Sequence, residues 1–277
     1  MNMKTWFITG CSSGIGAGLA KAVLEKGDQA VVTARSVEKV KGFEEQYPDR
    51  CLALKLDVTN DEDISRAVKE AQDKFGTIDV LINNAGHGYR SSIEEGDKKE
   101  VSELFQTNFF GPIELIKQVL PGMRAQHSGA IINVSSVAAA RSNIGSGYYA
   151  ASKAALELMS EGLVHELKPL GIKVMIVEPG SFRTSFYTAK NLKKSEHKIS
   201  DYAETAWKRS DSSVNTVTNQ PGDPDKAGKA IVDLIEREDA PLRYIMGTDG
   251  YEKVETALNK RMAEMEKWKE YSKITDF

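Results

Sequence analysis

The sequence contains little cysteine, no long hydrophobic run and almost no excess of either charge. Cys11 and Cys51 are too few for a disulfide framework, which points to a reducing, cytoplasmic location. The longest apolar runs, such as 6–8 and 175–177, are far too short to cross a bilayer. Acidic residues number 40 and basic residues 37, giving a formal charge of −3. This balance disfavours a nucleic-acid binder, because such proteins carry a basic excess.

Two further features are missing. Only Lys4 precedes the first short apolar stretch, so no signal peptide is predicted. The four histidines and two distant cysteines form no metal-ligand pattern. Hydrophobic residues make up 40% of the chain and charged residues 28%, which is typical of a folded globular protein. We find no linker between separate cores, so residues 1–277 are predicted to form a single domain.

Strand-like and helix-like segments alternate along the first two thirds of the chain. Strands are predicted at 4–9, 29–35, 52–57, 79–83, 130–134 and 172–177. Helical patterns are predicted at 16–26, at 36–46 after Ser36 as a cap, after Asn60 or Asp61, at 101–124 and at 148–167. This alternation predicts an α/β fold with a doubly wound, parallel, Rossmann-type sheet of about seven strands, helices on both faces and ligands at the carboxyl ends of the strands.

The pattern changes after Pro179. Residues 185–224 are polar and lack an apolar period, so they are predicted to form a substrate lid or a mobile loop. A helix is predicted at 225–238, a last strand at 242–246, and a charged C-terminal helix at about 249–272.

Aromatic residues in and beside the predicted lid allow two interpretations. They could line an apolar substrate pocket, or they could pack the lid onto the domain. These residues are Phe182, Phe186, Tyr187, Tyr202 and Trp207.

A glycine-rich turn follows the first predicted strand. Residues 9–16 read TGCSSGIG, with the spacing G-x3-G-x-G. Such a turn lets backbone N–H groups approach a pyrophosphate at the N-terminus of the next helix. A simple tight turn is the alternative, but the position between strand and helix favours phosphate binding.

Four motifs together resemble the short-chain dehydrogenases/reductases, over about residues 4–185. They are TGCSSGIG at 9–16, NNAG at 83–86, YAASK at 149–153, and Pro179-Gly180 followed by Thr184. The turn and the long tail are similar to the steroid- and retinol-dehydrogenase-like branch. The resemblance implies an oxidoreductase that transfers a hydride between NADP(H) and a small carbonyl compound or secondary alcohol. An NADP(H)-binding sensor without turnover is the alternative.

The resemblance and the motifs place the cofactor along one edge of the sheet. The implied cofactor-binding residues are Gly10, Ser12, Ser13, Gly14, Ile15, Gly16, Arg35, Asp57, Val58, Asn84, Ala85, Gly86, Tyr149, Lys153, Pro179, Gly180 and Thr184. His87, directly after NNAG, could edge the same site.

The proposed acid/base is Tyr149. A Tyr and a Lys four residues apart share one helix face, and a nearby ammonium lowers the pKa of a phenol from about 10. Lys153, helped by the positive charge of an oxidised nicotinamide, is therefore predicted to make Tyr149 more acidic. Tyr148 is turned about 100° round the helix and is predicted to be core or pocket wall.

Two more catalytic positions come from the resemblance. A serine thirteen residues before the tyrosine is implied, which selects Ser136, with Ser135 as the alternative. Asn108 matches the family's asparagine, which distorts its helix and holds a water linking Lys153 to solvent. A purely structural Asn108 is the alternative.

The end of the second strand bears on the cofactor. NAD-preferring members usually have an Asp there, whereas this chain has Arg35, which can pair with a 2′-phosphate. Ser12 could add a hydroxyl contact. We therefore predict NADP(H), although an exposed loop arginine is the alternative and Glu38 keeps NAD(H) open. Family members commonly form dimers or tetramers through helices that correspond to 101–124 and 148–167, so a homodimer or homotetramer is expected.

Overall fold

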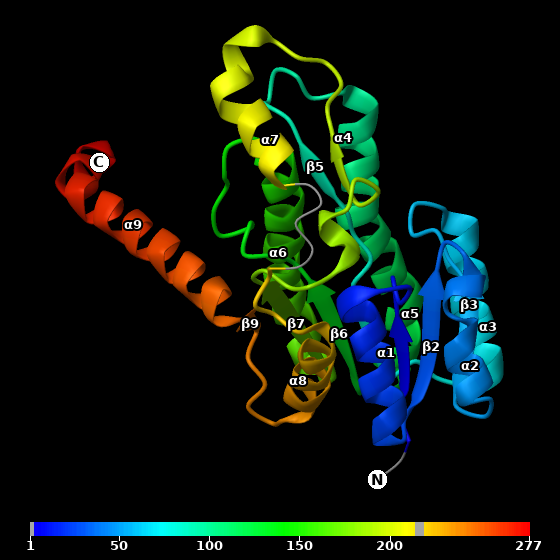
Figure 1. Ribbon diagram of the computed structural model, residues 1–277. Coiled ribbons are helices and arrows are strands. Elements are labelled where there is room, and N and C mark those ends of the chain that lie inside the picture. The colour runs from blue at the N-terminus through cyan, green and yellow to red at the C-terminus, as the bar shows by residue number, and fades with distance from the viewer. Residues whose placement is uncertain (1–2, 214–218) are drawn as a thin grey trace.

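A seven-stranded parallel sheet forms the centre of the protein. The computed structural model describes residues 3–213 and 219–277 (Figure 1). The strand order is β3-β2-β1-β4-β6-β7-β9. The strands are β1 (Thr5–Ile8), β2 (Gln29–Ala34), β3 (Cys51–Lys55), β4 (Val80–Asn83), β6 (Gly129–Val134), β7 (Ile172–Pro179) and β9 (Arg243–Met246). Because β1 and β4 are neighbours, the order reverses between them, which is where doubly wound sheets bind ligands.

Helices cover both faces of this sheet. The helices of the described residues are α1 (Gly14–Lys26), α2 (Lys41–Gln46), α3 (Asp61–Phe75), α4 (Lys98–Phe105), α5 (Gly111–Gln126), α6 (Gly147–Leu167), α7 (Lys208–Ser213), α8 (Pro224–Glu236) and α9 (Thr248–Ser272), of which α7 belongs to the lid and most of α9 to a projecting arm. Side chains alternate along each strand, so Trp6 and Ile8 join the core beneath α1 and α8, while Phe7 joins the core beneath α3, α5 and α6. The doubly wound sheet of seven strands predicted from the sequence is confirmed.

The stretch 36–46 differs from the prediction of one helix. It forms a short 3-10 turn at Val37–Lys39 and then α2, and Ser36 makes no side-chain capping bond. Val40 lies between the two pieces with φ −123° and is fully buried in the core. The helix is therefore interrupted at Val40, whose side chain is buried in the core. The sequence left either Asn60 or Asp61 as the cap of α3. The cap is Asn60, whose side chain accepts a hydrogen bond from the Asp63 N–H at 2.9 Å.

The predicted lid contains regular structure that the sequence pattern did not reveal. β8 (Leu192–Lys194) pairs in parallel with β5 (Gly88–Arg90), the strand that follows the NNAG motif. Short helical turns follow at Ser185–Tyr187, Ser200–Tyr202 and Ala203–Trp207. Residues 214–218 of the predicted lid lie outside the described residues.

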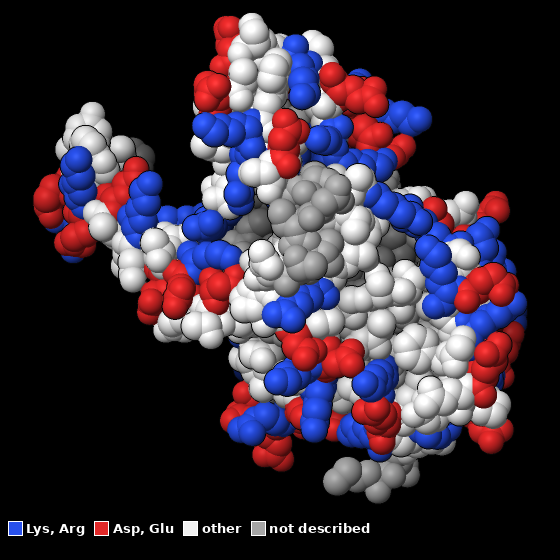
Figure 2. Space-filling view, viewed as in Figure 1, with Lys and Arg blue, Asp and Glu red and all other residues white. Residues whose placement is uncertain are grey.

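The C-terminal helix leaves the body of the molecule as an arm (Figure 1). Val254 is its last buried residue, and Met262, Met265 and Trp268 further along are at least half exposed. Lys, Arg, Asp and Glu side chains are mixed along the arm (Figure 2). Among the described residues, no helix has both the length and the apolar character needed to cross a membrane.

Candidate active site

The carboxyl ends of the central strands surround a cleft of about 790 Å³. A volume of this size is typical of sites for small molecules and cofactors. The predicted residues that line it are Gly10, Ser12, Ser13, Gly14, Ile15, Gly16, Arg35, Asp57, Val58, Asn84, Ala85, Gly86, Ser136, Tyr149, Lys153, Pro179, Gly180 and Thr184. Asn108 does not line the cleft but lies fully buried behind it.

The glycine turn opens the N-terminus of α1 towards this cleft. Gly14 begins the helix with φ +61°, and Ser13 makes no side-chain capping bond to it. The first N–H groups of α1 thus remain available to an anion. A Cβ at Gly16 would lie 2.3 Å from the Gly10 carbonyl oxygen, so the turn can close only around a glycine. Asn84 secures the turn by donating from Nδ2 to the Thr9 carbonyl at 2.8 Å.

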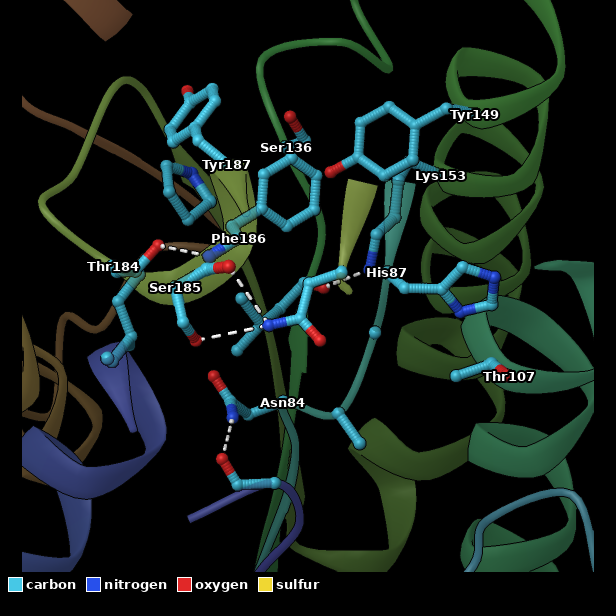
Figure 3. A pocket seen from close by; sticks show the side chains of 18 of the residues that line it. Asn84, His87, Thr107, Ser136, Tyr149, Lys153, Thr184, Ser185, Phe186 and Tyr187 are labelled. Atoms are coloured by element: carbon cyan, nitrogen blue, oxygen red, sulfur yellow. Dashed lines mark hydrogen bonds between the residues drawn. The ribbon is translucent and has the colours of Figure 1, made fainter. Parts of the chain in front are cut away.

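Tyr149 and Lys153 point into the cleft from the same face of α6 (Figure 3). Ser136, two residues beyond β6, lies near the Tyr149 phenol and acts on its pKa (Figure 3). The alternative residue, Ser135, instead donates to Glu157 Oε1 at 2.6 Å. Tyr148 is turned away and donates to the Ile93 carbonyl at 2.7 Å. The geometry therefore groups Ser136, rather than Ser135, with Tyr149.

Among the protein's own groups, burial outweighs the nearby positive charges that were expected to make the Tyr149 phenol acidic. Burial raises the pKa of Tyr149 to about 12, against the opposing effects of the Ser136 hydrogen bond and the positive charge of Arg90. Burial also lowers the pKa of Lys153 to about 8, while the charge of Glu157 acts to raise it. Spacing predicts that the two side chains share a face, but it does not include the cost of removing each charge from water.

Lys153 is held by the end of β6 and lies near the buried asparagine. Its Nζ donates to the Val134 carbonyl at 2.9 Å. A Cβ at Gly86 would lie 3.1 Å from Asn108 Oδ1 and 3.4 Å from Lys153 Nζ, which places both groups against the same backbone position.

Asn108 interrupts the helix, as the resemblance implies. It sits in a π-helical segment (Gln106–Phe110) between α4 and α5. Its Oδ1 accepts from the His87 N–H at 3.1 Å, and its Nδ2 donates to the His87 carbonyl at 3.0 Å and to Ser152 Oγ at 3.1 Å. Asn108 thus fixes the backbone directly after the NNAG motif.

Comparison with known proteins identifies the family. Residues 4–195 match the family described as short chain dehydrogenase. The chain belongs to the short-chain dehydrogenases. It is 33% identical over 275 residues to oxidoreductase BOA17 of Botryotinia fuckeliana, covering 97% of this chain and 98% of that protein. It is 36% identical over 247 residues to a 3-ketodihydrosphingosine reductase of Bacteroides thetaiotaomicron, covering 89% of each.

Solved structures agree with this assignment. A short-chain dehydrogenase from Streptomyces avermitilis is 39% identical, with a TM-score of 0.92 and full coverage of both chains. More distant structures share the fold alone. An alcohol dehydrogenase from Thermococcus sibiricus, solved with 5-hydroxy-NADP, is 23% identical with a TM-score of 0.73, covering 88% of this chain and 96% of that one. A Burkholderia phymatum enzyme, solved with NAD, is 21% identical with a TM-score of 0.76, covering 84% and 86%. Neighbours of this short-chain dehydrogenase thus include complexes with either nicotinamide.

The aromatic residues of the lid divide between the two interpretations. Three of them line the cleft of this short-chain dehydrogenase: Phe182, Phe186 and Tyr187. The Phe186 ring lies 5.6 Å from the Tyr149 ring, measured between centroids. Outside the cleft, Tyr202 donates to Glu94 at 2.7 Å and Trp207 donates to Glu95 at 2.7 Å. Their contacts hold the lid to the loop after β5.

His87 also lines the cleft of the short-chain dehydrogenase. Burial lowers its pKa to about 4, helped by the charge of Lys193, so the imidazole is neutral near pH 7. Its buried Nε2 has no hydrogen-bond partner within the described ranges.

Sequence reasoning missed several basic residues of this dehydrogenase's cleft, among them Lys190 and Arg90. Lys190 lies in the lid segment, where the nearby charges of Lys39 and Arg35 lower its pKa. Arg90 ends β5 and lines the cleft near Tyr149. Neither belongs to a motif, and folding brings Lys190 to Arg35 from a distant part of the chain. The carboxylate of Glu38, the residue that left NAD(H) as a possible cofactor, is paired with Lys41 at 2.6 Å.

Proposed function

We propose that this short-chain dehydrogenase is an NADP(H)-dependent oxidoreductase that interconverts a carbonyl compound and a secondary alcohol. The observation that carries the proposal is the grouping of Tyr149, Ser136 and Lys153 in one cleft with the open N-terminus of α1. A dinucleotide fits these residues, because the glycine turn offers free N–H groups to its pyrophosphate.

Each catalytic side chain has a role that its surroundings support. A bound nicotinamide supplies the hydride to the carbonyl carbon, or accepts it from the alcohol. In reduction Tyr149 donates its proton to the substrate oxygen, and its pKa of about 12 keeps the phenol protonated near neutral pH. Ser136 orients that oxygen and stabilises its developing charge. Lys153 would hold the nicotinamide ribose, with its ammonium on the same face of α6 as the phenol.

Asn108 acts through its neighbours in this proposal. Its hydrogen bonds to His87 fix the backbone beside Gly86, against which Lys153 is placed. Thr184 lies across the glycine turn, since a Cβ at Gly14 would be 2.9 Å from its side chain. This position suits a contact with the nicotinamide carboxamide.

The preference for NADP(H) over NAD(H) rests on a group of like charges. Arg35 lines the cleft after β2, and Lys190 is close enough to Lys39 and Arg35 for their charges to lower its pKa. Such repulsion is relieved when a doubly negative phosphate binds among the cations. Arg35→Asp should therefore lower the ratio of kcat/KM for NADPH to that for NADH by at least ~10-fold. An unchanged ratio would refute the assignment of Arg35.

Other parts of the proposal have separate support. The name of the Bacteroides relative favours a ketone as the reacting group. Exposed Phe110 and Leu158 lie on the helices expected to join subunits, which favours a homodimer or homotetramer. The two cysteines are buried and unpaired, in keeping with a reducing cytoplasm. We treat residues 1–277 as a single oxidoreductase domain.

The test of catalysis is Tyr149→Phe. This change removes the proton donor but keeps the ring that packs on Phe186. Reduction of a panel of ketones, followed by NADPH consumption, should fall by ~10² to 10⁴-fold, while the Kd for NADPH stays within about threefold. Full turnover by Tyr149→Phe would overturn the role of the phenol. A wild-type protein that binds NADPH and reduces no ketone would favour the sensor alternative.

A further inference from the structure

Arg90 places a buried positive charge at the substrate end of the cleft. It is the last residue of β5, and only 8% of its surface is exposed. Pairing of β5 with β8 fixes it, since the Arg90 carbonyl accepts from the Ser195 N–H at 3.0 Å. The guanidinium is near enough to Tyr149 for each to influence the charge of the other.

This guanidinium lacks a counter-charge. Within residues 3–213 and 219–277, Arg90 forms no ion pair, and its buried Nε has no acceptor. Among the described residues, the guanidinium makes one hydrogen bond, from a terminal nitrogen to the neighbouring Tyr89 carbonyl at 3.5 Å, the limit for such a bond. A buried arginine is normally paired, because removing its charge from water costs several kcal/mol.

A buried carboxylate that shares a small cavity with Arg90 already has other partners. Glu95 and Arg90 line the same small cavity beneath the lid. Glu95 Oε1 accepts from the Ile199 N–H at 2.6 Å and from Trp207 at 2.7 Å, and Oε2 accepts from the Ser92 hydroxyl at 2.7 Å. Glu95 therefore stabilises the lid rather than Arg90.

The surroundings increase the positive potential at Arg90. Arg209 is near enough for its charge to act on Arg90, and both line the cleft. The acidic residues on the described lining are Asp57 and Glu103, and Glu103 is paired with Lys193 at 3.0 Å. A protein with a net charge of −3 thus has a cleft in which basic side chains predominate.

We propose that Arg90 binds an anionic group of the substrate, a carboxylate or a phosphate, close to the carbonyl carbon that is reduced. This inference rests on the proposed function, because it takes Tyr149 as the group that meets the reacting oxygen. The planar guanidinium can bind either anion through two parallel hydrogen bonds. Its position near Tyr149 favours a short separation between anion and ketone, as in 2-oxo acids, 3-oxo acids and phosphate esters of hydroxyketones.

The first experiment compares charged substrates with neutral ones that carry the same ketone. Each oxo acid is paired with its methyl ester, and each ketone phosphate with its free alcohol, and kcat/KM is measured from NADPH consumption. The wild type should prefer the anion by ~10 to 100-fold, mainly through KM. A larger preference for the oxo acids over their esters indicates a carboxylate site. A larger preference for the ketone phosphates over their alcohols indicates a phosphate site. Equal rates for acid and ester, and for phosphate and alcohol, would overturn the proposal.

Variants separate anion binding from a general effect on catalysis. Arg90→Met should lose the preference for the anion, so that its loss of kcat/KM on each anionic substrate exceeds its loss on the matched neutral ketone by at least ~10-fold. Arg90→Lys should retain part of the preference, and Arg261→Met, on the exposed arm, should change neither rate. An equal loss on charged and neutral ketones in Arg90→Met would show that Arg90 acts on Tyr149 instead, which overturns the proposal.

Binding without turnover separates this inference from the proposed function. Calorimetry on the Tyr149→Phe protein with NADPH measures the Kd for the same oxo acids and ketone phosphates. If adding Arg90→Met to the Tyr149→Phe protein weakens anion binding at least ~10-fold, the anion site at Arg90 is supported even if the function assigned to Tyr149 fails. No anion binding, or binding that is indifferent to Arg90, overturns it. The melting temperature of Arg90→Met should not fall, because an unpaired buried charge is replaced by an apolar side chain.

Discussion

At the scale of single residues, three carboxylates gather around Arg243. Arg243 on β9 lies 3.6 Å from Glu157, 3.5 Å from Glu178 and also pairs with Glu161. Burial raises the pKa of Glu178 to about 7, with the charge of Glu157 acting in the same direction and Arg243 opposing it. Glu178 is 2% exposed, so most of the missing hydration is not recovered.

This carboxyl predicts a pH dependence of stability. Between its ordinary pKa of 4.5 and about 7, folded Glu178 holds a proton that the unfolded chain has released. Its contribution to the free energy of unfolding therefore decreases as pH rises through that window, by about 3 kcal/mol at most. Glu178→Gln stays neutral and should remove this slope from urea unfolding measured at pH 5, 6, 7 and 8.

A matched variant controls for the loss of an arginine partner. Glu161→Gln removes a carboxylate that is more exposed than Glu178 and should keep the wild-type slope. If Glu178→Gln and the wild type gave parallel curves across the four pH values, the burial argument for Glu178 would be wrong.

For single residues, the sequence predicts where side chains lie better than it predicts their pKa values. The four-residue spacing correctly puts Tyr149 and Lys153 on one face, because helix geometry alone determines it. The pKa of Tyr149 depends on how far Phe186 and the lid exclude water, which no spacing encodes. Arg90 and Lys190 were missed for a related reason, since an isolated basic residue gives no signal until folding shows what surrounds it.

Among the elements, the lid is anchored in part by one buried carboxylate, Glu95. Burial acts to raise the pKa of Glu95, but hydrogen bonds from Ile199, Trp207 and Ser92 lower it to about 2. The bond to Ile199 connects segments that are far apart in the sequence. Glu95 thus joins the loop after β5 to the short helices of the lid.

Loss of this anchor should loosen the lid specifically. Glu95→Ala leaves the Ile199 N–H and the Trp207 indole N–H without their acceptor, which costs ~1–3 kcal/mol per buried group. Limited trypsin digestion should then cleave after Lys198 faster than in the wild type. Glu94→Gln is the control, because Glu94 is exposed and bonds Tyr202 alone among the described residues. Equal cleavage rates for wild type and Glu95→Ala would contradict the anchoring role.

Strands and helix interruptions were missed where the local sequence pattern is weakest. Strands β5 and β8 have three residues each, too few to show alternation, and their pairing depends on contact between distant segments. The π-helical segment around Asn108 keeps the apolar face of a longer helix, so periodicity alone predicts one continuous helix over 101–124. By contrast, β1, β2 and β6 are apolar, buried runs next to clear turns, and all three were predicted within two residues.

For the whole molecule, two surfaces present apolar side chains. The first lies on the helices expected to join subunits, with Phe110 49% exposed and Leu158 67% exposed. The second is the arm, where Met262, Met265 and Trp268 are at least half exposed. Exposed apolar side chains of this kind are typical of protein–protein contacts.

The proposed oligomer predicts the effect of a charge on α6. Leu158→Glu places a carboxylate in the expected subunit contact, where burial without a partner would cost several kcal/mol. Light scattering after gel filtration should show a lower mass than for the wild type. The melting temperature of the separated subunit should reflect lost association alone, because Leu158 contributes little to its own core.

Truncation after Thr256 tests whether the arm carries the association instead. It removes no buried side chain, because Val254 is the last buried residue of α9, so the body should fold and keep NADPH binding. If α5 and α6 join the subunits, the truncated protein keeps the wild-type oligomeric state and Leu158→Glu loses it. The reverse pattern would move the subunit contact to the arm, since the apolar side chains of Met262, Met265 and Trp268 would then supply the buried area that association requires.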